Sequence, residues 1–219
     1  DISYYDGGDL DLPFGNVDKC LSLISQATKE VLDDHKLPIV IGGEHLISLP
    51  VIQEVYNKYK KDLVLIHIDA HADLREDYIG ENRSHATVIR RCCDFINPKN
   101  IYQFGIRSGT KEEFEFAKKN LNFYPFEVLE PLKGCIEKLK GRPIHVTLDI
   151  DVLDPAYACA TGTPEAGGIS SKEMIESILL FNSLNIVGFD LVEVSPVYDV
   201  ADRTSLLAAK LIREMMLIV

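Results

Sequence analysis

The stretch from Leu63 to Asp73, LVLIHIDAHAD, decides how this chain is organised. It opens on the apolar run Leu63 to Ile66, which is typical of a buried parallel strand. Asp69, His71 and Asp73 then follow at every second position, and the side-chain period of an extended strand places all three on the same side of the chain. Two carboxylates and an imidazole brought together at a strand end carry a large electrostatic cost unless a cation holds them. The pattern therefore predicts most of a metal site.

Two further segments repeat this arrangement. Ile144 to Asp151 reads IHVTLDID, an apolar strand that ends in two aspartates, and Ile41 to His45 reads IGGEH, a strand that breaks at glycines and delivers a histidine. Parallel α/β sheets bind their ligands at the carboxyl ends of the strands, so these three strand ends are expected to meet. The predicted metal ligands are His45, Asp69, His71, Asp73, Asp149 and Asp151.

Charge balance predicts how many cations these ligands hold. Four carboxylates carry a formal charge of about −4, which two divalent cations neutralise, whereas one cation would leave about −2 buried at high cost. Carboxylate oxygens with two imidazoles and no thiolate favour Mn²⁺ over Zn²⁺ or Fe²⁺, and the imidazoles disfavour Mg²⁺. A water between two such cations would be hydroxide near neutral pH. We therefore expect two Mn²⁺ per chain.

The segments around these ligands resemble the metal motifs of the ureohydrolase family, the arginases and agmatinases. Five motifs follow one another in the family's order: Gly42–His45 (GGEH), Asp69–Asp73 (DAHAD), Asp149–Pro155 (DIDVLDP), Gly162–Gly168 (GTPEAGG) and Val192–Asp199 (VEVSPVYD). The last two incline the resemblance towards the agmatinases. A lone D-x-H-x-D would be a weak signal, but this resemblance covers nearly the whole chain.

The resemblance implies a fold and a reaction. The implied fold is an α/β, three-layer α/β/α sandwich around a mainly parallel sheet, formed by residues 1–219 as a single ureohydrolase domain that lacks the family's N-terminal segment. The implied reaction is hydrolysis of a guanidino C–N bond, with agmatine as the small cationic substrate and urea and putrescine as products. The resemblance also implies Mn²⁺ and a homo-oligomer, either a trimer or a hexamer.

Further residues complete the expected active site. His85 matches a catalytic histidine of the family, and we expect it to bind substrate and pass a proton to the leaving amine; a surface or capping histidine is the alternative. Glu193 can hold a guanidinium bidentately, although a solvated carboxylate at a strand end would show the same pattern. Asp151 is expected to stabilise the tetrahedral intermediate as well as bind metal, and Thr161 and Thr163 to line the pocket.

Other polar residues receive structural interpretations. His67 is expected to be a buried, hydrogen-bonded histidine, Asp190 to be structural, and Asp154 to cap its turn. His35 and His145 belong to no recognisable group of functional residues in the sequence, so no role is predicted for them.

Composition limits the compartment and the partners. A chain of 219 residues and 24.5 kDa is about the size of one large α/β domain. The net charge of −11 argues against nucleic acid and anionic membranes as partners, and no apolar run approaches the ~18–20 residues of a membrane span. The five cysteines show no C-x-x-C spacing, so reduced thiols and a cytoplasmic location are expected.

The rest of the chain alternates predicted strands and helices, as a parallel sheet between helix layers requires. Asn16 is expected to cap the first helix. A helical pattern over Phe126 to Lys140 is expected to be interrupted by Pro131 and Gly134. Residues 74–84 and 155–168 are predicted to be loops over the site.

Several functions remain open at this point. Guanidinobutyrate, arginine and formiminoglutamate are alternative substrates; Arg75 stands where arginases carry an asparagine, which counts against arginine. Arg75 or Arg83 could meet an anionic substrate tail. A catalytically silent, metal-stabilised assembly protein is opposed by the complete ligand set together with His85 and Glu193. A dinuclear phosphoesterase would need more basic groups near the metals than the loop arginines provide.

Overall fold

The structure, a computed structural model, describes residues 2–219. Its strands are β1 (Ile39–Ile41), β2 (Val64–Ile68), β3 (Ile101–Phe104), β4 (Asn122–Tyr124), β5 (Pro143–Asp149) and β6 (Asn185–Val192). Its α-helices are α1 (Val17–Asp33), α2 (Ser48–Tyr59), α3 (Val88–Cys92), α4 (Lys111–Asn120), α5 (Leu129–Leu139), α6 (Ser171–Leu180) and α7 (Arg203–Ile218).

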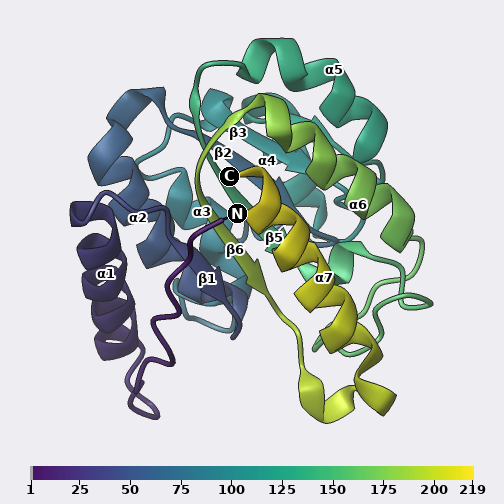
Figure 1. The fold of residues 1–219 in the computed structure, drawn as a ribbon. Coiled ribbons are helices and arrows are strands. Elements are labelled where there is room, and N and C mark those ends of the chain that lie inside the picture. Colours follow the sequence, from purple (N-terminus) through teal and green to yellow (C-terminus); the bar gives the residue numbers. More distant parts are fainter. Residues whose placement is uncertain (1) are drawn as a thin grey trace.

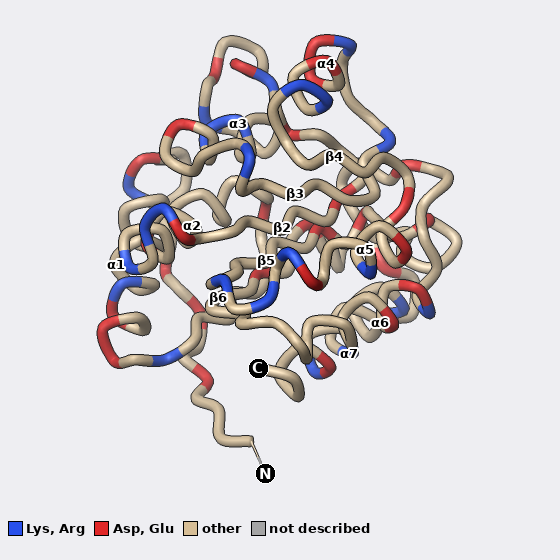
Figure 2. Tube along the Cα trace, turned by 90° about the horizontal axis from the view of Figure 1, so that it is seen from above, with Lys and Arg blue, Asp and Glu red and all other residues tan. Residues whose placement is uncertain are grey.

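The strands form one sheet in the order β1-β6-β5-β2-β3-β4, and every pairing between them is parallel. Helices cover both faces of this sheet (Figure 1). Seen from above, α1, α2 and α3 lie on one side of the strands and α5, α6 and α7 on the other, with most charged residues on the helices and outer loops (Figure 2). The predicted three-layer α/β/α sandwich is confirmed.

The apolar run at β2 explains why the sheet is covered on both faces. Alternate residues of a strand point to opposite faces, and each of these side chains is fully buried. Leu63 and Leu65 pack with apolar residues of α1 to α4, whereas Val64, Ile66 and Ile68 pack with those of α5, α6 and α7. Two cores therefore meet at this central strand, which fixes the position of its carboxyl end.

The first helix is capped as the sequence predicts, but the helix α5 differs from its prediction. The side chain of Asn16 accepts a hydrogen bond from the backbone N–H of Lys19 at 3.0 Å, as expected for a helix cap. The helical pattern expected from Phe126 begins only at Leu129, and neither Pro131 nor Gly134 interrupts it. Pro131 lies in the first turn, where a backbone N–H has no partner within the helix, so its ring costs no hydrogen bond.

Among residues 2–219, no helix combines the length and the apolar character that crossing a membrane requires.

Candidate metal centre

The predicted metal ligands converge at the carboxyl edge of the sheet. His45 begins a short 3-10 helix, η1 (His45–Ile47), just after β1, while Asp149 ends β5 and Asp151 lies in the 3-10 turn η5 (Ile150–Val152) that follows it. The remaining three follow the end of β2. Because β2 and β5 are adjacent parallel strands, their carboxyl ends lie side by side.

The segment 69–73 is not an extended strand, so the geometry predicted for it is wrong in detail. β2 ends at Ile68, and Asp73 has a left-handed backbone with φ of 53°. The loop after β3 holds this segment in place: the backbone N–H groups of Arg107 and Ser108 donate to the carbonyl of Ala70 at 2.8 and 2.9 Å. The three polar side chains still reach the same site, but long-range hydrogen bonds rather than strand alternation direct them there.

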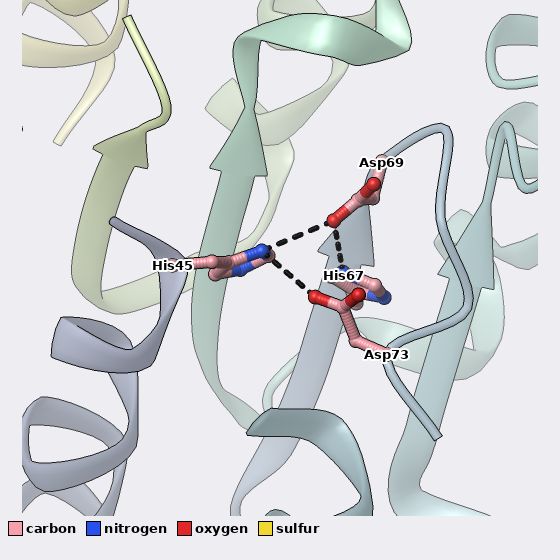
Figure 3. Close-up of side chains that lie close together, drawn as sticks. All are labelled: His45, His67, Asp69 and Asp73. Atoms are coloured by element: carbon pink, nitrogen blue, oxygen red, sulfur yellow. Dashed lines mark hydrogen bonds and ion pairs between the residues drawn. The ribbon is translucent and has the colours of Figure 1, made fainter. Parts of the chain in front are cut away.

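The first group of ligands surrounds His45. Its Nδ1 lies 3.0 Å from Asp73 Oδ2, 3.1 Å from Asp69 Oδ2 and 3.4 Å from Asp149 Oδ2. Figure 3 shows the imidazole pointing at the carboxylates of Asp69 and Asp73. This Nδ1 is buried and has no hydrogen-bond partner, although three carboxylate oxygens face it. A lone pair and several carboxylate oxygens aimed at one point suit a divalent cation.

The second group lies on the other side of Asp69. His71 Nδ1 is 2.9 Å from Asp151 Oδ2 and 3.6 Å from Asp69 Oδ1. Asp151 is 1% exposed, and its Oδ2 has no hydrogen-bond partner. Asp69 therefore offers one oxygen to each group, as expected of a carboxylate shared by two cations.

The protonation equilibria show the cost of this cluster without a cation. Burial raises the pKa of Asp149 well above its usual range, and the neighbouring charges of Asp151 and Asp69 add to the effect. Burial and the Asp69 charge likewise raise the pKa of Asp73. Burial alone would lower the pKa of His71, but the carboxylates of Asp151 and Asp69 raise it to about 11. Protons occupy the positions that cations would take, so the residues present fit a pair of divalent ions.

These shifts predict a pH-dependent stabilisation by metal. In the metal-free protein the raised pKa of His71 contributes stability that is complete below the unfolded value of 6.5 and is lost as pH rises towards about 11. The raised pKa of Asp149 has the same sign, because the folded state binds the proton more tightly than the unfolded state. Bound cations replace these protons. We expect the melting temperatures of Mn²⁺-loaded and chelated protein to diverge as pH rises from about 6.5 to about 9. Scanning calorimetry at matched ionic strength measures this gap; a constant or shrinking gap contradicts the prediction.

His67 lies with the first group, but its hydrogen bonds give it a different role. Its Nε2 is 2.8 Å from Asp69 Oδ2, and its Nδ1 is 3.0 Å from Nε2 of Gln103. The Gln103 amide nitrogen can only donate, so His67 Nδ1 accepts and its Nε2 carries the proton given to Asp69. A protonated nitrogen cannot bind a metal. The structure therefore places His67 as a buried donor to a ligand, in agreement with the sequence interpretation.

A cavity of about 320 Å³ opens over the cluster. It is lined by His45, His71, Ala72, Asp73, Arg75, Tyr78, His85, Ala86, Ser108, Gly109, Thr110, Glu113, Asp149, Thr163 and Glu193. The predicted substrate residues His85, Thr163 and Glu193 are thus brought together above the metal ligands. Asp151 and Thr161, the other pocket candidate, are buried and do not line the cavity.

His85 begins the 3-10 helix η3 (His85–Thr87), and it pairs with Glu44, the residue just before η1. Its Nδ1 lies 3.4 Å from Glu44 Oε1, and its ring packs edge-on against Tyr78 with centroids 5.2 Å apart. The Glu44 carboxylate raises the pKa of His85 above the ordinary value, outweighing the opposing effect of partial burial. His85 is therefore protonated over a wider pH range than a free histidine.

Glu193 is directed into the cavity by an unusual backbone. β6 ends at Val192, and Glu193 has a left-handed φ of 65°, which is costly for a residue with a side chain and is often found at functional sites. Its Oε1 accepts a hydrogen bond from the backbone N–H of His45 at 2.6 Å. Burial raises the pKa of this carboxyl, and an approaching cation would favour its charged form.

The two loop arginines separate in the structure. Arg83 pairs with Asp18 on α1 and does not line the cavity, so it cannot meet a substrate tail there. Arg75 does line the cavity, with its Nε 3.6 Å from Glu113 Oε2 and its guanidinium over the Tyr78 ring. Its charge is partly neutralised before any ligand arrives.

Sequence reasoning missed the residue that organises the second active-site loop. Arg107 donates to the carbonyls of Asp151 and Glu165, both at 2.7 Å, and so joins the metal-binding turn to the GTPEAGG motif. Asp154 lies just before this loop and accepts hydrogen bonds from the backbone N–H groups of Gly167 and Gly168 at the end of the loop. The position of Arg107 could have indicated this role. Arg107 follows the end of β3, and because β3 neighbours β2 in the sheet, it lies at the same edge as the metal ligands.

Comparison with known proteins agrees with this geometry. The model of the arginase family matches residues 1–218. An agmatinase from Bacillus anthracis is 54% identical over 220 residues, covering 99% of this chain and 76% of the relative. A guanidinobutyrase from Pseudomonas aeruginosa is 36% identical over 227 residues, covering 98% and 70% of the two chains. A crystal structure of a Clostridium difficile protein superposes with a TM-score of 0.94 at 42% identity, covering 97% of this chain and 78% of that one.

The fold and the site thus define a ureohydrolase-type hydrolase with a metal-binding cluster at the carboxyl edge of a parallel sheet. The chain belongs to the arginase family, and within it the chain is an enzyme of the agmatinase type.

Proposed function

We propose that the chain hydrolyses the guanidino C–N bond of agmatine, releasing urea and putrescine, with two Mn²⁺ as cofactor. One observation carries the proposal: four buried carboxylates, the buried imidazole of His45 and the partly exposed imidazole of His71 gather at the floor of a cavity whose wall holds Glu193 and His85. The agmatinases among the relatives support the choice of substrate. Manganese is favoured because the donors are carboxylate oxygens and imidazole nitrogens without a thiolate.

The chain's own residues divide the work of binding and proton transfer. Two bound cations would supply an activated water and a Lewis acid beside the guanidinium carbon. Glu193 accepts N–H groups of the guanidinium and orients its carbon towards the cluster. Asp151 would help to hold a cation and, through it, stabilise the tetrahedral intermediate formed from the guanidinium. His85, protonated with the help of Glu44, gives its proton to the leaving nitrogen, so that the C–N bond breaks to a neutral amine rather than an amide anion.

Substrate choice provides the direct test. Agmatine ends in a cationic amine, whereas arginine and guanidinobutyrate carry a carboxylate. Arg75 is the cation of the 74–84 loop that lines the cavity, and its pairing with Glu113 weakens its attraction for a carboxylate. We expect kcat/KM for agmatine to exceed that for arginine by at least about 100-fold, or about 2.7 kcal/mol. Urea release with Mn²⁺, measured over a series of guanidino compounds, gives this ratio.

Guanidinobutyrate is the second candidate substrate, favoured by Arg75 in the cavity wall and by the guanidinobutyrase among the relatives. Faster turnover of guanidinobutyrate than of agmatine at matched concentration would reassign the substrate. In that case Arg75→Gln should selectively raise KM for guanidinobutyrate. Turnover of neither compound, together with full binding of Mn²⁺, would instead support a catalytically silent protein.

A further inference from the structure

A second polar cluster is buried beneath the metal site, between β5, β6 and the start of α2. It consists of Ser48, His145, Thr147 and Asp190, and all four are fully buried. His145, which has no functional neighbours in the sequence, lies with Nε2 2.7 Å from Asp190 Oδ2. β5 and β6 pair with Thr147 opposite Asp190, so the sheet itself brings these two residues together. Burial of a charged carboxylate is costly unless hydrogen bonds or an ion pair compensate for the lost hydration.

Hydrogen-bond distances fix the direction of each proton in this cluster. Asp190 Oδ1 accepts from the hydroxyls of Thr147 at 2.6 Å and Ser48 at 2.7 Å, because an ionised carboxylate can only accept. The three donors around Asp190, which are His145, Thr147 and Ser48, lower its pKa despite its burial. Thr147 has a single hydroxyl proton, and Asp190 uses it. Towards any other neighbour Thr147 can therefore act only as an acceptor.

That other neighbour is His45. Its Nε2 lies 3.0 Å from the Thr147 hydroxyl oxygen, in a fully buried contact. Since Thr147 must accept, His45 Nε2 carries a proton, and in the neutral ring that would bind a metal the lone pair is left on Nδ1. Nδ1 is the nitrogen that faces the carboxylates of Asp69, Asp73 and Asp149 without a hydrogen-bond partner (Figure 3). The buried cluster thus sets both the tautomer and the rotation of this ring.

We propose that Thr147 and Asp190 are positioning residues that prepare His45 to bind a metal through Nδ1. The charge of Asp190 polarises the Thr147 hydroxyl, which holds the Nε2 proton of His45 and makes Nδ1 a better electron-pair donor. Without this contact the ring could rotate or adopt the other tautomer, and an N–H would then point at the cation. The inference rests on the proposed function only in taking the cluster above as a metal site.

The test compares Thr147→Val with Thr147→Ser. Valine keeps the size of the side chain and removes the acceptor, whereas serine keeps the hydroxyl. Competition with a chelator and titration calorimetry measure Mn²⁺ affinity, and the melting temperature of the metal-free protein records any general structural cost. We expect Mn²⁺ affinity to fall about 10- to 100-fold in Thr147→Val and to stay within about threefold of the unaltered protein in Thr147→Ser.

The outcomes separate positioning from packing. Equal Mn²⁺ affinity in Thr147→Val and the unaltered protein overturns the proposal, as does an equal loss in both variants. If neither variant folds, ¹⁵N-histidine spectra of the unaltered, Zn²⁺-loaded protein decide the matter: a proton on Nε2 of His45 supports the proposal, and a proton on Nδ1 overturns it. Failure of the unaltered protein to bind any Mn²⁺ would instead overturn the proposed function, and this inference with it.

Discussion

Asp69→Asn is expected to reduce urea release from agmatine by at least about 10³-fold, because it weakens both halves of the metal cluster at once. Asp69 faces His45 through Oδ2 and His71 through Oδ1. Its amide replacement removes one negative charge and one of these oxygens, so two dications would no longer be neutralised. Losing the several kcal/mol that a metal contributes to the reaction corresponds to a rate loss of this size. Metal analysis after loading with Mn²⁺ should find about two ions per chain in the unaltered protein and at most one in the variant.

The control for this substitution removes the same charge elsewhere. Asp94 is exposed, pairs with Arg91 at 3.4 Å and does not line the cavity. Asp94→Asn should retain two Mn²⁺ and full turnover, because exposed ion pairs contribute little. Two Mn²⁺ and undiminished urea release in Asp69→Asn would contradict the shared-ligand arrangement. One ion with full activity in the unaltered protein would falsify the dinuclear mechanism itself.

Sequence patterns predicted the sheet and the convergence of the ligands because both depend on local signals. An apolar run such as Leu63 to Ile66 identifies a buried strand wherever it occurs, and polar residues at the carboxyl ends of parallel strands must share one edge. The pattern could not describe the path of residues 69–73. That path is set by hydrogen bonds to Arg107 and Ser108, more than thirty residues away along the chain.

The partners of individual side chains were the least predictable part of the site. Nothing local shows that β6 lies beside β5, yet that pairing brings Asp190 to His145 and Thr147. The loop charges were equally ambiguous. Arg83 and Arg75 belong to one short loop, but Arg83 pairs outside the cavity with a residue of α1, and only Arg75 reaches the cavity wall. Long-range packing decides which partner each side chain contacts, and no periodic pattern in the sequence indicates that packing.

His85→Asn is expected to lower kcat by about 10²- to 10⁴-fold, the range usual for a positioned acid–base group, while leaving two Mn²⁺ bound. His85 lines the cavity but lies outside both metal-binding groups, so its loss should separate catalysis from metal content. The matched control is His35→Asn: His35 is exposed and has φ of 58°, a backbone conformation that asparagine tolerates well. Equal kcat in the His85 variant and this control would assign the proton transfer to another group.

The contact with Glu44 adds a pH signature that a packing role would not produce. If protonated His85 is the acid, activity falls at high pH as His85 loses its proton. The Glu44 carboxylate, 3.4 Å from His85 Nδ1, raises the pKa of His85 and moves that fall to higher pH. Glu44→Gln removes the charge but keeps the shape, so the alkaline limb of the kcat profile should shift to lower pH while its maximum changes little. An unshifted alkaline limb would separate the titration of His85 from turnover.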